Sequence, residues 1–123
     1  MKIHFLREKT FILIKDDNRY LVNPYFGDAI TPLPVMPKDI MKNVDSVVFT
    51  YNLDNYIDAL TIKGLNLNKN KDKTFYLKND VDIKFIKSLG FLNAKPISEE
   101  LIADINEFIN LKYTPTNGEI IFI

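Results

Sequence analysis

The sequence predicts a single α/β domain in which a mixed β-sheet carries two or three short helices on one face. Near the amino terminus, three short runs rich in β-branched and aromatic residues follow one another, separated by polar turns. Further along, strand-like runs are interspersed with segments that carry helix start and stop signals. The 123 residues suffice for one compact domain and are too few for two ordinary ones, so we expect one domain spanning residues 1–123.

The first strands are expected at residues 3–6, 10–14 and 19–22, with polar turns at 7–9 and 16–18. Short turns of this kind join antiparallel neighbours, so the three strands are expected to form a meander.

A surface loop is expected over residues 31–37, because each of its three prolines fixes φ and lacks an N–H group. Pro37 suits the first position of a helical turn over residues 37–42, where a missing donor costs nothing. Apolar strands are expected at residues 44–50 and 74–77.

Between these two strands, a short helix is expected to be capped by Asp54 or Asn55, to run through Leu60 and to end near Gly64. The Asn- and Lys-rich residues 66–71 are expected to be a mobile connection.

The clearest helix signals follow residue 78. Asn79 or Asp80 can cap a helix, Gly90 can adopt the left-handed conformation that ends it, and Phe91 can fold back onto Ile86.

Residues 98–108 are ambiguous, since their apolar positions fit a helical stripe while later positions alternate as in a strand. We favour strands, because residues 114–118 are a turn signal and residues 119–123 a plain β run. A helix in the first part of this stretch stays open.

Composition limits the possible functions. Sixteen basic residues balance sixteen acidic ones, so the chain has no overall field that would attract nucleic acid or an anionic membrane, and we expect neither as a partner. The absence of cysteine excludes disulfides, thiol nucleophiles and cysteine-ligated metals, and the single histidine, His4, excludes a site built from two imidazoles. No apolar run has the length of a membrane span, and a cytoplasmic location is the default expectation.

One segment carries a family resemblance. An apolar strand ends in Thr50 and is followed by Tyr51, Leu53, Asn55 and Tyr56. This segment resembles the metal-binding loop of the metallo-β-lactamase fold family, in which the strand ends in Thr and continues as His-x-His-x-Asp-His. The three His positions are here Tyr51, Leu53 and Tyr56, and the Asp position is Asn55. The resemblance therefore implies a metal site that has lost its ligands.

The resemblance extends to other segments in the family's order. Residues 1–11 resemble its first hairpin, residues 21–26 a strand ending in Asp-Pro with Asn23 at the Asp position, residues 37–50 the helix and strand before the metal loop, and residues 88–91 a later helix end. The similarity is to the branch of metal-dependent hydrolases that act on phosphorylated sugars, lactones and related small molecules. It implies half of a four-layer αββα sandwich, because the chain corresponds to the amino-terminal half of that fold.

The replaced ligands predict that no metal and no cofactor binds there, since neither a phenol near neutral pH nor an isobutyl group offers the lone pair that a metal needs. If the loops keep their family positions, Tyr25, Phe26 and the two tyrosines of the loop surround an aromatic hollow that could bind a small ligand or another chain, although filling of the core is the simpler account. The candidate ligand-binding residues are Asn23, Tyr25, Tyr51, Leu53, Asp54, Asn55 and Tyr56.

Three functions stay open. The favoured hypothesis is a non-catalytic protein that acts by binding or protein interaction, with no catalytic residues. The first alternative is a metal-dependent hydrolase of small molecules that uses non-standard ligands such as Asp54, Asp58 and His4. A structural role for each of these three is the simpler interpretation. The second alternative is a subunit completed by another chain.

A half-sandwich would leave one apolar sheet face uncovered. We expect a homodimer in which two copies pack through this sheet face. Closure of the core within one chain, by the carboxy-terminal segment, is the alternative.

Overall fold

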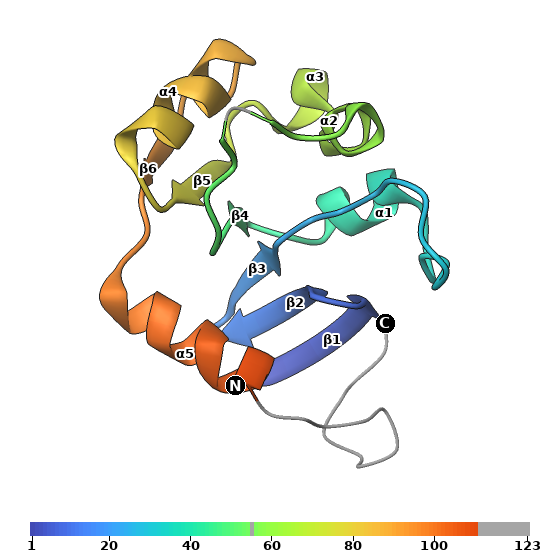
Figure 1. Ribbon diagram of the computed structural model, residues 1–123. Coiled ribbons are helices and arrows are strands. Elements are labelled where there is room, and N and C mark those ends of the chain that lie inside the picture. The colour runs from blue at the N-terminus through green and yellow to red at the C-terminus, as the bar shows by residue number, and fades with distance from the viewer. Residues whose placement is uncertain (55, 111–123) are drawn as a thin grey trace.

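The protein forms a six-stranded mixed sheet whose strands lie side by side in their order along the chain (Figure 1). This computed structural model describes residues 1–54 and 56–110. The strands are β1 Lys2–Arg7, β2 Thr10–Lys15, β3 Asn18–Val22, β4 Ser46–Val48, β5 Thr74–Leu77 and β6 Ala94–Pro96. The first three pair antiparallel, whereas β3 to β6 pair parallel. The predicted mixed α/β sheet is confirmed.

The helices are α1 Pro37–Lys42, α2 Ala59–Leu65, α3 Leu67–Asn70, α4 Asp80–Ser88 and α5 Glu99–Asn110. Each parallel connection advances one place across the sheet in the same direction. Because such crossovers are almost always right-handed, α1 to α4 must lie on the same face. Figure 1 shows this layer above the sheet, with α5 on the opposite side.

The core between the sheet and the α1–α4 layer is built on one row of side chains. The strand register aligns Ile12, Leu21, Val47, Phe75 and Ala94 across five strands, and all five are buried. Residues on either side of each row member point to the opposite face, as the pleat requires.

The second face is covered by α5, whose Leu101 and Ile105 are buried against the sheet. Their apolar partners on the strands are Ile3, Phe11, Leu13, Val22 and Val48. Lys15 of β2 also binds α5, because its Nζ donates hydrogen bonds to Glu100 Oε1 and Asp104 Oδ2. These two carboxylates raise the pKa of Lys15.

The preference for strands over residues 98–108 is wrong, and the helical alternative holds. Ser98 supplies the start signal, because its Oγ accepts a hydrogen bond from Leu101 N at 3.1 Å. The apolar side chains Leu101 and Ile105 lie on one face of this helix and are buried against the sheet. The expected turn at 114–118 and strand at 119–123 lie outside the described residues.

The predicted cap of the helix after β4 is also wrong. Asp54 lies in a turn, with a left-handed φ of 54°, and no helix begins there. The helix starts five residues later, capped by Asp58, whose Oδ2 accepts from Thr61 N at 3.1 Å. The expected connection at 66–71 contains the single turn α3, and the three-residue strand β6 was not predicted.

The signals around α4 are confirmed. Asn79 Oδ1 accepts from Asp82 N at 2.8 Å, and Gly90 has a φ of 113°. Phe91 lies in the same cluster as Ile86, and its ring centroid is 4.4 Å from that of Phe75.

None of the helices in the described ranges combines the length and the apolar character that crossing a membrane requires.

The position of α5 leads to a stability prediction. Ile105→Ala should lower the free energy of unfolding by about 2–5 kcal/mol, because it removes a fully buried side chain from the contact with the sheet. Urea unfolding followed by circular dichroism measures the loss. Asn106→Ala, an exposed position one residue along the same helix, is the control and should stay within about 0.5 kcal/mol of the parent. Equal effects of the two substitutions would contradict the packing of α5.

Candidate functional site

The candidate site lies at the edge of the sheet where the parallel strands end. Residues that follow β3, β4 and β5 meet at this edge, because parallel strands all point their carboxyl ends the same way. In open α/β sheets, this is the edge where ligands usually bind. The candidate ligand-binding residues that the structure describes follow β3 or β4, whereas His4 lies in β1.

Asn23 joins β3 to β4 at this edge. Its Oδ1 accepts from Thr50 N and its Nδ2 donates to Thr50 Oγ1, both at 2.8 Å. Its backbone N donates to Val48 O at 2.8 Å, and its carbonyl accepts from Thr10 Oγ1 at 2.8 Å. Asn23 is buried and has a φ of 49°, which asparagine tolerates better than most residues. Its side chain holds the scaffold together.

Tyr25 is 43% exposed. The guanidinium of Arg7 lies 5.9 Å from the centroid of the Tyr25 ring, and Nη1 donates to the carbonyls of Tyr25 and Gly27. Phe26, by contrast, is buried in the core, where a Cβ added at Gly64 would lie 2.3 Å from its ring. The missing side chain of Gly64 makes room for Phe26.

Tyr51 and Tyr56 are exposed, at 47% and 71%. Tyr51 packs edge-on against Phe49, with ring centroids 6.0 Å apart. Burial of its hydroxyl, and then the negative charge of Asp58, raise the pKa of Tyr51. The raised pKa disfavours the ionised phenolate, the form in which a phenol is a strong metal ligand.

Tyr25, Tyr51 and Asp58 lie close together. A Cβ added at Gly27 would be 2.9 Å from both the Tyr25 hydroxyl and Asp58 Oδ2. The charge of Asp58 also acts on the Tyr51 hydroxyl. The structure thus brings two of the predicted aromatic residues together beside one carboxylate.

Leu53 is buried, and a residue that the sequence analysis missed holds it in place. Its N–H donates to Asp82 Oδ2 at 2.8 Å. Asp82, which is 1% exposed, also accepts from Asn79 Nδ2 at 3.2 Å. Asn79 Nδ2 in turn donates to Asn52 Oδ1 at 3.0 Å, so the start of α4 anchors the loop that follows β4. The capping pattern of α4 was the available signal for Asp82, but its long-range partner was not visible in the sequence.

The three proposed oxygen and nitrogen ligands do not form a cluster. Asp58 caps α2 and also accepts from Thr61 Oγ1. His4 lies in β1 opposite Ile12, and burial, followed by the charges of Arg19 and Lys2, lowers its pKa. Asp54 is exposed, and Asn55 lies outside the described residues. Within residues 1–54 and 56–110, no group of three histidine, aspartate or glutamate side chains is placed to hold a metal ion.

Two solved structures share this fold. The isothiocyanate hydrolase from Delia radicum gut bacteria aligns with a TM-score of 0.66 and 22% identity, over 80% of this chain and 42% of that one. A possible metal-dependent hydrolase from Veillonella parvula DSM 2008 aligns with a TM-score of 0.63 and 23% identity, over 79% of this chain and 42% of that one. No protein-family model matches the sequence, and neither does any curated protein.

The likeness defines a class of fold. About four-fifths of this chain has the fold of part of a hydrolase, and the chain spans 42% of the length of each solved relative.

The anchoring of Leu53 leads to a prediction about Asp82. Asp82→Ala should lower the free energy of unfolding by about 1–3 kcal/mol, because it leaves the buried Leu53 N–H without an acceptor. Asp82→Asn keeps one acceptor oxygen and should lose less. Hydrogen exchange at the Leu53 amide, together with urea unfolding, reports both effects.

Asp80→Ala is the matched control, since Asp80 is an exposed acid in the same first turn of α4. Faster exchange at Leu53 in the Asp80 variant, or unchanged exchange in Asp82→Ala, would contradict the anchoring role.

Proposed function

We propose that this chain is a partial metallo-β-lactamase-like domain that acts by binding rather than by catalysis. One observation carries the proposal: three polar side chains at the carboxyl edge, Asn23, Asp58 and Asp82, are engaged in hydrogen bonds within the protein. Asn23 bonds to Thr50, Asp58 to Thr61 and Asp82 to Leu53. A catalytic metal site needs side chains whose lone pairs are free to reach the ion. Because these polar groups bind the loops of the protein itself, they support the fold and are not free to hold a metal ion.

The surface proposed for binding is formed by Tyr25, Tyr51 and Tyr56, which are the exposed aromatic side chains at this edge among the described residues. Tyrosine combines a large apolar ring with a hydroxyl group, and it is enriched where proteins bind their partners. The rings of Tyr25 and Tyr51 are each held by a neighbour, Arg7 and Phe49, which lowers the entropy lost on binding. The surface suits a partner with apolar area and hydrogen-bonding groups.

A cytoplasmic location is part of the same proposal.

A second candidate is a metal-dependent hydrolase with non-standard ligands. The observation that favours it is Asp54, whose exposed side chain takes part in no hydrogen bond among the described residues. Both solved relatives are named as hydrolases, which supports the same candidate. A metal there would need further ligands from groups now engaged elsewhere, such as Asp58.

The two candidates differ in metal binding. Calorimetric titration of chelator-stripped protein with zinc, and then with manganese, should give no stoichiometric heat at neutral pH. A tight isotherm that disappears in Asp54→Ala would overturn the binding proposal and favour the hydrolase. Heat that persists unchanged in that variant would show that Asp54 is not a ligand, and it would still contradict the expected absence of metal binding.

The state of assembly is a separate proposal. The sequence predicts a homodimer through the sheet face, with closure of the core within one chain as the alternative. Because Leu101 and Ile105 of α5 cover that face, we propose closure within the chain, by a helix in place of the expected strands.

Light scattering at micromolar concentration should therefore give the mass of one chain, 14.3 kDa. Twice that mass would support the homodimer. In that case, Ile105→Ala, which loosens α5, should change the fraction of dimer, whereas Asn106→Ala should not.

A further inference from the structure

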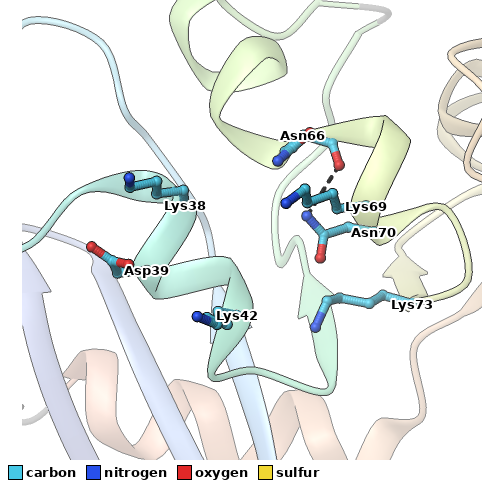
Figure 2. A pocket seen from close by; sticks show the side chains of 7 residues that line it. All are labelled: Lys38, Asp39, Lys42, Asn66, Lys69, Asn70 and Lys73. Carbon is cyan, nitrogen blue, oxygen red and sulfur yellow. Dashed lines mark hydrogen bonds between the residues drawn. The ribbon is translucent and has the colours of Figure 1, made fainter.

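A second feature lies away from the tyrosine edge, in the layer of helices. A hollow of about 520 Å³ separates α1 from α3 and the segment before β5 (Figure 2). Lys42 is followed by β4, and Lys73 is followed directly by β5, so both lie toward the amino ends of the parallel strands. The tyrosine edge is formed at the carboxyl ends, and the two features are therefore at opposite edges of the sheet.

The lining of the hollow is rich in lysine. Lys38 and Lys42 lie on α1, and Figure 2 shows Lys69 and Lys73 extending toward it from the other side. Asp39 is the only acid in the lining. When all five groups are ionised, four lysines and one aspartate give a net charge of +3. The chain as a whole has a formal net charge of zero, so this local excess of positive charge is compensated elsewhere.

None of these lysines forms an ion pair within the described residues. In the part of the chain that the structure describes, the ion pairs join Lys15 to Glu100 and Asp104, and none involves the four lysines of the hollow. Like charges brought together by folding repel one another, and they attract a soluble anion. The grouping comes from two stretches of the chain, residues 38–42 and the lysine-rich residues 66–73, which folding brings to face each other.

Two of the side chains that line the hollow, Lys73 and Asn70, are held in place by hydrogen bonds to backbone carbonyls. Lys73 is half-buried and its Nζ donates to the carbonyl of Val44, while burial lowers its pKa despite the nearby charge of Asp45. Asn70 is buried, and its Nδ2 donates to the carbonyls of Leu65 and Asn66 at 2.9 and 3.0 Å. An anion beside Lys73 would favour its charged form, so binding and protonation would support each other.

We propose that this hollow binds a small organic anion that carries phosphate groups. Its volume lies in the range of small-molecule sites, about 300–1,000 Å³. Lysine ammonium groups bind phosphate oxygens as point charges without requiring one fixed orientation. A net charge of +3 in the lining matches a ligand with two or three negative charges. The site is independent of the tyrosine edge, so either proposal can fail without the other.

Pyrophosphate is the probe. In a titration followed by amide and lysine Nζ chemical shifts, pyrophosphate should bind saturably, with shifts concentrated in α1, α3 and around Lys73. Lys42→Gln/Lys69→Gln should weaken binding at least tenfold, since it removes two exposed ammonium groups that take part in no side-chain hydrogen bond within residues 1–54 and 56–110. Orthophosphate, with one phosphate group, should bind more weakly than pyrophosphate.

Lys84→Gln/Lys87→Gln is the matched control, because it removes the same charge from exposed positions of α4. It should leave the affinity for pyrophosphate within twofold of the parent. Equal weakening by both pairs of substitutions, or shifts that do not saturate, would overturn the site. A short single-stranded oligonucleotide that binds the same lysines more tightly than pyrophosphate would overturn the assignment to a small molecule.

Discussion

The structure depends on the junction between the antiparallel and parallel halves of its sheet, which Asn23 holds. At this residue the chain leaves β3, having paired antiparallel with β2 and parallel with β4. Its backbone bonds to Val48 and Thr10, and its side chain bonds twice to Thr50. Four hydrogen bonds from one buried residue thus fix the ends of three strands relative to one another. The positions of Tyr25 and Tyr51 follow from that arrangement.

The same use of polar groups recurs along the carboxyl edge. Asp58 starts α2, and Asp82 joins α4 to the loop at Leu53. Asp58 accepts from a backbone N–H in the first turn of α2, and Asp82 accepts from the buried N–H of Leu53. Without these carboxylates, both N–H groups would lack a hydrogen-bond acceptor. In a hydrolase-like fold, this edge is where catalytic groups would be expected. In this chain, Asp58 and Asp82 stabilise the loops, and Tyr25, Tyr51 and Tyr56 are among the side chains exposed there.

Local signals were enough to predict the meander, the proline loop, α1 and α4. Asn79 and Gly90, for example, act within a few residues of their positions. The signal for α5 was ambiguous, because its apolar pattern suited two structures and the deciding surface, around Phe11 and Val22, lies far away in sequence. The loop residues of the candidate site were found through the family resemblance. The partner of Leu53 was missed, since Asp82 is 29 residues further along the chain. The lysine hollow was missed for the same reason.

The order of the strands has a consequence for how the chain folds. Every strand pairs with its neighbour in sequence, so the sheet can grow by adding one strand at a time from the first hairpin, and each step closes only a short or moderate loop. The exception is α5, which follows β6 at one side of the sheet but packs near β2 at the other side. Its Glu100 and Asp104 bind Lys15, which is 85 and 89 residues away in sequence. This contact closes the longest loop and can form only when the sheet is in place. We therefore expect α5 to unfold or separate from the sheet before the rest of the native structure does. Such local unfolding would expose one face of the sheet while the face under α1 to α4 stays packed.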